Sequence, residues 1–133
     1  MTYKTPVERL LTELDFARLN QLEGGHLPAD LEEALAATDL VASRAVPDNV
    51  LTMYSQAMIE DPVTLRQHKY TLCYPDDAEP ADGFISVLSP LGAALIGLRV
   101  GDVAQWTTPD GRAHKARVRV LLFQPEASGD YVT

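Results

Sequence analysis

The first 45 residues carry apolar positions at helical spacing. One stripe is formed by Leu10, Leu11, Leu14, Ala17 and Leu22. Two start signals compete for this helix. Thr5–Glu8 places a proline at the first helical position and a glutamate at the capping-box position, and Thr12–Asp15 offers a second, later cap. The pattern predicts an amphipathic helix and leaves open which signal begins it.

A second helix is predicted after a glycine-rich turn. Glu23-Gly24-Gly25-His26 ends the first helix, because paired glycines permit positive φ just beyond a helix C-terminus. Pro28 suits the first turn of the next helix, whose apolar face is formed by Leu31, Ala34, Leu35, Thr38 and Val41. So short a connection predicts an antiparallel, coiled-coil-like helical hairpin over residues 1–45. Each helix should contain about 12–15 residues, or roughly 18–22 Å of length.

The apolar period changes to two after the junction at Ala45–Asn49. The alternation predicts strands over residues 51–59, 66–74, 84–88, 103–107 and 112–123. Ser89-Pro90 predicts a short helix with the serine as N-cap, and Gly97 ends that helix. The expected fold class is therefore α+β. Residues 48–125 should form an antiparallel sheet around one short helix, and residues 126–133 a C-terminal tail.

The composition is that of one ordinary globular domain, or of a small domain with a helical appendage. Hydrophobic residues make up 46% of the 133 residues, and Cys73 is the single cysteine, so no internal disulfide can form. No apolar run approaches the roughly 20 residues that span a bilayer, and the N-terminus lacks the apolar stretch of a signal peptide. We expect a cytoplasmic monomer that does not associate with membranes.

The formal net charge of −8 argues against direct nucleic-acid binding. Such binding gains its affinity from Lys and Arg side chains that neutralise phosphates. Neither the part before residue 45 nor the part after it is basic. Any link to nucleic acid should therefore run through a protein partner, without sequence-specific contacts from this chain.

A motif of small residues at fixed spacing occupies Ile85–Asp102. A predicted strand is followed by Ser89-Pro90 and the hydrophobic Leu91. The small or fixed positions after it are Gly92, Ala94-Leu95, Gly97 and Gly101-Asp102. This segment resembles the signature of the C-terminal domain of the Gre transcript-cleavage factors. Three further segments, Val50–Tyr54, Tyr70–Pro75 and Gln124–Tyr131, are similar to the regulator of nucleoside diphosphate kinase (Rnk) family, which is related to GreA and GreB and has a short N-terminal hairpin.

The resemblance implies both a fold and a partner. Residues 48–125 should adopt an FKBP-like fold that docks on the β′ rim of the secondary channel of RNA polymerase. The contact would be made by Leu88, Ser89, Pro90, Leu91 and Gly92. Ser-Pro also has a purely structural interpretation as a helix cap. Both can hold, because a loop between a strand and a helix is exposed on a rigid scaffold.

Two departures from the Gre pattern bear on mechanism. The residue before Ser-Pro is often acidic in the cleavage factors but is Leu88 here, which favours a more apolar contact. The cleavage factors also carry an Asp-x-x-Glu type pair at the tip of a long coiled coil, where it helps to hold a catalytic Mg²⁺. The hairpin tip here is Glu23, Gly24, Gly25 and His26, and one glutamate beside two glycines is a poor holder for a cation. We therefore expect competition with Gre-type factors without stimulation of transcript cleavage.

The remaining polar residues predict no enzyme. His26, His68 and His114 are far apart in sequence, and we expect no catalytic residue, cofactor or metal site. Lys115, Arg117 and Arg119 allow two interpretations: a face toward an acidic polymerase surface, or a solvated strand face or edge guarded against aggregation, and the second is favoured. Two alternatives stay open. One is a regulator that binds another protein such as nucleoside diphosphate kinase. The other is an FKBP-like prolyl isomerase, which would need an aromatic-lined pocket.

Overall fold

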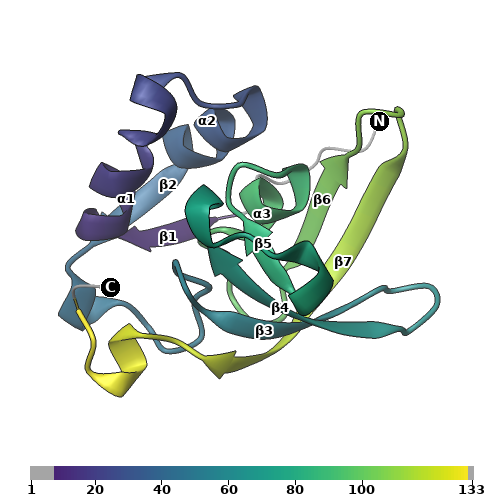
Figure 1. Ribbon diagram of the computed structural model, residues 1–133. Coiled ribbons are helices and arrows are strands. Elements are labelled where there is room, and N and C mark those ends of the chain that lie inside the picture. The colour runs from purple at the N-terminus through teal and green to yellow at the C-terminus, as the bar shows by residue number, and fades with distance from the viewer. Residues whose placement is uncertain (1–7, 132–133) are drawn as a thin grey trace, which may run out of the picture.

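The computed structural model describes residues 8–131, which form a mixed α+β fold with few helices (Figure 1). The first half contains β1 (Arg9–Thr12), α1 (Glu13–Leu19), η1 (Leu22–Gly25), α2 (Ala29–Ala36), β2 (Thr38–Val41), η2 (Ser43–Ala45) and β3 (Gln56–Glu60). The second half contains β4 (Gln67–Cys73), η3 (Pro75–Asp77), η4 (Pro80–Asp82), β5 (Phe84–Ser86), α3 (Pro90–Leu95), β6 (Val103–Thr107), β7 (Ala113–Phe123) and η5 (Glu126–Ser128). Across residues 8–131, no helix is both long and apolar enough to cross a membrane.

Five strands form the main sheet in the order β5-β4-β3-β7-β6. Helix α3 packs against β6 and β5, as the sequence predicts for a sheet around one short helix (Figure 1). Two register shifts between β3 and β7 bend the sheet, as β-bulges do. The expectation of a wholly antiparallel sheet is wrong at one edge. There β5 runs parallel to β4, with Leu72 opposite Ile85. The acidic loop of residues 74–83 returns the chain toward the starting end of β4 before β5 begins.

The first predicted strand is shorter than its apolar alternation suggests. Only Gln56–Glu60 forms β3, and residues 51–55 form a buried turn instead. Tyr54 has a left-handed backbone, with φ of +64°, and the Thr52 N–H donates to Ser55 Oγ at 2.9 Å. Thr52 is as deeply buried as its neighbours on either side. The alternation there reflects a turn in which all residues except the partly exposed Tyr54 are buried, rather than a pleated strand.

The N-terminal helical hairpin is not confirmed, and its predicted helix lengths are wrong. Helix α1 has 7 residues and α2 has 8. The apolar positions assigned to the ends of these helices lie in β1 and β2, which pair in parallel with Leu10 opposite Asp39. The Asp15 N–H donates to Thr12 Oγ1 at 3.1 Å, so the later of the two start signals begins α1. The earlier signal, at Thr5–Glu8, falls almost wholly outside the described residues.

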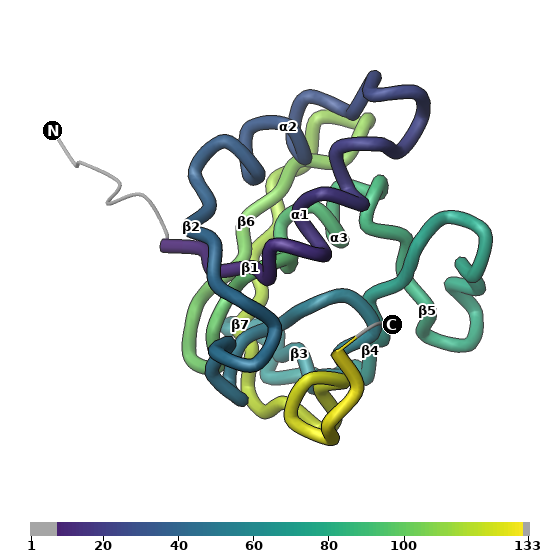
Figure 2. The backbone as a smooth tube through the Cα atoms, turned by 90° about the vertical axis from the view of Figure 1, so that its left-hand side faces the viewer, coloured from purple at the N-terminus to yellow at the C-terminus, as the bar shows by residue number. Residues whose placement is uncertain are grey.

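The N-terminal lobe, defined here as residues 9–41, packs on the rest of the protein rather than extending from it (Figures 1 and 2). Helix α2 contacts α3, and Leu11, Leu19 and Leu31 belong to the same buried cluster as Leu95 and Val118. The half-buried guanidinium of Arg9 reinforces this seam, because its Nη1 donates to the carbonyl oxygens that end α3. These are Ala93 O, Ala94 O and Ile96 O, at 3.4, 3.1 and 2.6 Å.

The residues that follow β7 are fastened to the segment that follows the lobe. Gln124 Nε2 donates to the carbonyl oxygens of Pro47 and Val50, both at 2.8 Å. The guanidinium carbon of Arg44 lies 4.7 Å from the centre of the Tyr131 ring, which is a cation–π contact. Both views show these residues beside the segment that precedes β3 (Figure 2).

Candidate protein-interaction site

The Ser-Pro segment is held by three short-range hydrogen bonds. Ser89 Oγ accepts from the Gly92 N–H at 3.1 Å and donates to Ser86 O at 2.7 Å. The Leu88 N–H donates to Ser86 Oγ at 3.1 Å. The predicted helix cap is therefore confirmed, and the Ser89 hydroxyl is fully engaged within the chain. Ser89 fixes the shape of this loop.

Gly92 has a structural explanation of its own. It is buried where α3 meets β5, and a Cβ atom built on it would lie 2.0 Å from Ser86 O. No side chain fits in that space, so glycine is required for α3 to lie this close to the strand. The other members of the predicted contact set, Leu88, Pro90 and Leu91, are half-buried and keep part of their apolar surface exposed.

Two hollows open on either side of this segment. The first, of about 460 Å³, lies between α2, α3 and the β6–β7 hairpin, and Pro90 lines it. The second, of about 690 Å³, lies between the β3–β4 loop, α3 and the same hairpin, and Leu91 lines it. We call the second the hairpin groove. Its walls include Ile59, Val63, Tyr70, Leu91, Trp106 and His114.

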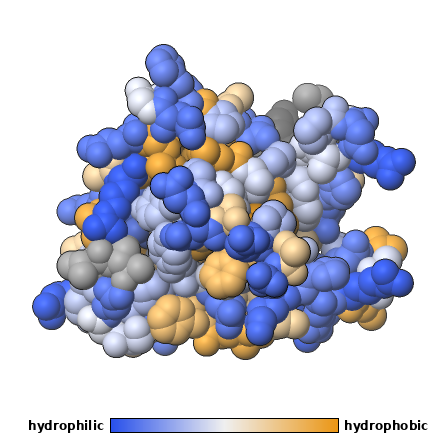
Figure 3. Space-filling model, in the orientation of Figure 1, coloured by the Kyte–Doolittle hydropathy of each residue, from blue (hydrophilic) through white to orange (hydrophobic). Residues whose placement is uncertain are grey.

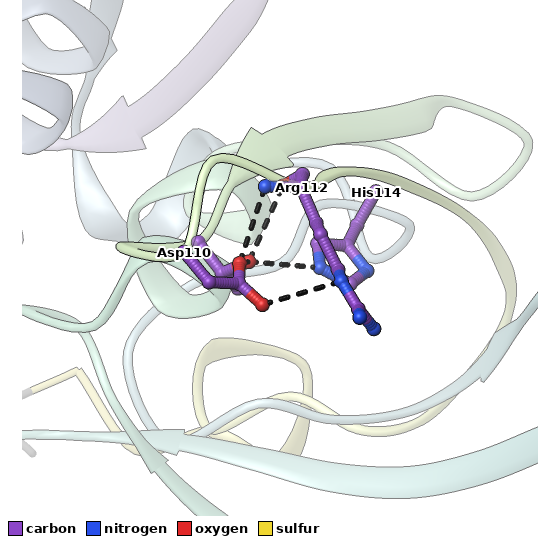
Figure 4. Close-up of polar contacts among 4 residues, drawn as sticks. Asp110, Arg112 and His114 are labelled. Atoms are coloured by element: carbon purple, nitrogen blue, oxygen red, sulfur yellow. Dashed lines mark hydrogen bonds and ion pairs between the residues drawn. The ribbon is translucent and has the colours of Figure 1, made fainter.

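The wall shared by the two hollows is a stacked pair of rings. Trp106 and His114 face each other across β6 and β7, with ring centres 5.4 Å apart and planes 14° from parallel. His114 Nε2 lies 3.1 Å from Thr108 Oγ1, and the Thr108 hydroxyl donates to Asp110 Oδ1 at 2.5 Å (Figure 4). Because that hydroxyl has only one proton, Nε2 of His114 must be the donor in its contact with Thr108. The turn thus fixes the orientation of the imidazole.

Asp110 organises the turn that holds this pair. It accepts from the Arg112 N–H at 3.1 Å, and its Oδ2 lies 3.4 Å from Arg112 Nε (Figure 4). Hydrogen bonds from Thr108 and Arg112 lower the pKa of the Asp110 carboxyl, so it stays ionised. The tight turn at Pro109–Gly111 thereby positions the rings of the groove.

The polar side chains of Thr108, His114 and Cys73 are engaged or buried within the chain. Thr108 gives its proton to Asp110 rather than to His114, so the imidazole is not a base for that hydroxyl. Cys73 is buried in β4, as expected of a small apolar residue, and burial raises the pKa of its thiol. Within residues 8–131, no group of three or more His, Cys, Asp or Glu side chains could hold a metal.

A second ring pair and two cations complete the hairpin groove. His68 and Tyr70 stack on β4 with ring centres 5.9 Å apart. Arg66 and Lys115 also line the groove, and both are exposed. Sequence reasoning missed these residues as a site. The available signal was the alternation that places Tyr70, Trp106 and His114 at regular positions of three different strands.

The predicted hairpin tip lies on the N-terminal lobe. Glu23, Gly24, Gly25 and His26 are all exposed. Glu23, Gly24 and Gly25 have φ of +51°, +63° and +89°, so this turn is left-handed over three successive residues. The structure does not bring these residues together with the Ser-Pro segment, which lies between β5 and α3 (Figure 1).

The fold and site together consist of a curled mixed sheet, one capped helix and an apolar groove beside the cap. Residues 46–121 match the family model described as the C-terminal part of the transcription elongation factors GreA and GreB. This match covers more than half of the 133 residues and includes the Ser-Pro segment, all residues that line the groove, and the sheet up to residue 121 of β7. The chain belongs to the GreA/GreB family.

Individual relatives agree with this assignment. The chain is 33% identical over 129 residues to the regulator of nucleoside diphosphate kinase of Escherichia coli K12, which covers 92% of this chain and 95% of that protein. It is 44% identical over 72 residues to the transcription elongation factor GreA of Solidesulfovibrio magneticus, covering 54% of this chain and 44% of that protein. Among solved structures, GreA/GreB from Nitrosomonas europaea superposes with a TM-score of 0.71 at 32% identity, covering 90% of this chain and all of that one. These names are those of regulators and elongation factors.

Proposed function

We propose that this protein is a transcription regulator that binds bacterial RNA polymerase at the β′ rim of the secondary channel and does not stimulate transcript cleavage. The observation that carries the proposal is the rigid Ser-Pro segment. It presents half-buried Leu88, Pro90 and Leu91 at the surface, within the part of the chain that matches the GreA/GreB family. A rigid loop on a folded scaffold is a common place for a binding surface.

The contact should be apolar rather than polar. The Ser89 hydroxyl is engaged by Ser86 and Gly92, and Gly92 is enclosed by backbone. The exposed parts of Leu88, Pro90 and Leu91 are therefore the surface that a partner can cover. Burying such a cluster supplies most of the energy in many small interfaces.

The N-terminal lobe lacks the grouped carboxylates that stimulation of transcript cleavage would need at its exposed tip. A catalytic divalent cation needs several oxygen ligands held close together. The exposed tip carries Glu23 alone between apolar and glycine neighbours, and the lobe lies against α3 instead of projecting. Such a protein would occupy the polymerase rim and exclude cleavage factors without replacing their chemistry.

Binding to purified bacterial RNA polymerase tests the proposal, with Leu88→Asp as the central variant. A carboxylate buried against an apolar partner surface should weaken binding by about tenfold or more. The matched control is Leu122→Asp, which places the same charge at an exposed leucine of β7 outside the proposed contact. Equal affinities of the two variants, or no binding by the wild type, would refute the proposal.

A second candidate function comes from the name of the Escherichia coli relative, the regulator of nucleoside diphosphate kinase. A direct regulator would bind that kinase itself. The same titration with purified nucleoside diphosphate kinase in place of polymerase separates the two functions. We expect saturable binding to polymerase and none to the kinase.

A further inference from the structure

We infer that the hairpin groove and the loop Asp61–Arg66 beside it form a second docking element, which receives an acidic segment of the polymerase that carries apolar side chains. The inference rests on the proposed function and extends the interface beyond the Ser-Pro segment. The loop lies at the far end of the β3–β4 hairpin, where hydrophobic surface stands out among hydrophilic neighbours on the right of Figure 3.

The loop displays apolar side chains to solvent. Val63 is 88% exposed and Leu65 is 66% exposed, the two highest values among the exposed large hydrophobic residues of the described chain. Loop tips that serve only as connections are usually polar, and clustered exposed apolar side chains mark interaction sites. Val63 lines the apolar groove, and Leu65 lies two residues further along the same loop, so a partner seated in the groove can reach both side chains.

The loop is also held in one shape. Asp61 Oδ1 accepts from the N–H groups of Val63 and Thr64, at 2.8 and 2.9 Å. The Leu65 N–H donates to Asp61 O at 2.9 Å, and the Asp61 N–H donates to Arg66 O at 2.9 Å. A pre-organised loop loses little conformational entropy on binding, so its apolar surface contributes more fully to affinity.

Leu65 is unfavourable for folding in its backbone conformation as well as in its exposure to solvent. Its φ of +61° lies in the left-handed region, which a bulky side chain rarely adopts and which costs on the order of 1 kcal/mol. Glycine would remove that cost and would also remove exposed apolar surface. A leucine that is unfavourable on both counts is best explained by a contact made outside the chain.

The charge around the groove selects the partner. Arg66 and Lys115 line it, together with His68 and His114. The one acidic residue in the lining is Asp61, which keeps its negative charge while it accepts from two backbone N–H groups, so the two cations Arg66 and Lys115 outnumber the anions by one. A chain of net charge −8 thus carries a locally basic groove, which complements an acidic surface and disfavours a second copy of the same acidic chain.

The groove is continuous with the Ser-Pro segment. Leu91 lines the groove, and its neighbour Pro90 lines the hollow on the other side of Trp106. One partner surface can therefore cover both elements. The combined interface would have an apolar centre and a basic edge, as stable protein interfaces often do.

The test is a titration of purified bacterial core RNA polymerase with the wild type, Val63→Asp, Leu65→Gly and Arg66→Glu, at low and moderate salt. The matched controls are Val120→Asp and Arg117→Glu, which make the same changes at exposed positions of β7 that do not line the groove. Groove variants should bind about tenfold more weakly, and Arg66→Glu should also reduce the dependence on salt. Controls should stay within about twofold of wild type.

Leu65→Gly separates binding from folding. Its thermal midpoint should equal or exceed that of the wild type, because the left-handed backbone is relieved, whereas its affinity should fall. Loss of affinity together with loss of stability would overturn the inference.

The outcomes separate the groove from the proposed function. If groove variants and controls behaved alike while Leu88→Asp still weakened binding, the groove would be refuted and the proposed function would stand. No binding by the wild type would overturn both. Self-association that Val63→Asp abolished would also refute the inference, in favour of a second copy as the occupant.

Discussion

Asp15 and Met53 join the N-terminal lobe to the main sheet. Asp15 Oδ2 accepts a hydrogen bond from the Met53 N–H at 3.1 Å, which links α1 to the turn before β3. The Asp15 side chain is 1% exposed, and burial raises the pKa of its carboxyl to about 7. The Met53 hydrogen bond and the positive charge of Arg18 act in the opposite direction, and the negative charge of Glu126 adds to the effect of burial. This seam therefore holds a carboxyl that titrates near neutral pH.

Stability should depend on the protonation of Asp15. In the folded protein the pKa of this carboxyl is about 7, against an ordinary value of 3.8. Folding is therefore accompanied by uptake of a proton at pH values between these two. The free energy of unfolding should fall as pH rises from 4 to 7 and level off above that. Asp15→Asn keeps an acceptor for Met53 without a charge, and it should be more stable than wild type at pH 8 by roughly 1–4 kcal/mol.

Urea unfolding at several pH values measures this difference. Asp39→Asn is the control, because Asp39 is exposed on β2 and its replacement should leave the pH profile of the wild type unchanged. Parallel profiles for wild type and Asp15→Asn would show that this carboxyl does not titrate in the window.

Gly92→Ala tests the close packing of α3 on β5. The added methyl would meet Ser86 O at 2.0 Å, so the helix must shift away from the strand. We expect a loss of roughly 2–3 kcal/mol, measured by chemical unfolding. Gly111→Ala is the comparison, because its φ of +84° is unfavourable for alanine but its Cβ would meet no atom within 4 Å, and it should cost about 1 kcal/mol. The account of Gly92 would be wrong if Gly92→Ala were the milder change.

Ser89 should act on binding through the shape of the loop. Ser89→Ala removes the cap of α3 and should cost about 1 kcal/mol of stability. Ser89→Thr keeps the hydroxyl and should preserve both stability and polymerase affinity. If Ser89→Thr lost affinity while keeping stability, Ser89 would have to contact the partner directly.

Local chemistry predicted much of the C-terminal fold from sequence. The Ser89 cap depends on neighbouring residues alone, and the structure contains it. The N-terminal lobe was mispredicted because Leu10 and Leu11 fit a helical stripe as well as a strand. Contacts with distant residues favour the strand: the Leu10 N–H donates to Gly97 O at 3.0 Å, and β1 pairs with β2. Helical spacing in a short apolar run cannot contain that information.

The groove could not be predicted from the sequence because it also depends on contacts between distant residues. It joins the β3–β4 loop, α3 and the β6–β7 hairpin, which are far apart in sequence. The stacking of Trp106 on His114 depends on the register of that hairpin, and sequence patterns rarely fix a register to the residue. Val63 and Leu65 could have been noticed as apolar residues between two predicted strands, but only the structure shows that the loop carrying them borders a hollow.

The most direct measurement of the central claim uses stalled elongation complexes supplied with a purified Gre-type cleavage factor. Increasing amounts of this protein should slow transcript cleavage by displacing that factor, and the protein alone should produce no cleavage above the polymerase background. Leu88→Asp should inhibit about tenfold more weakly, in line with its expected loss of affinity. Cleavage stimulated by this protein on its own, or cleavage by the Gre-type factor that stays unchanged at saturating amounts of this protein, would contradict the account.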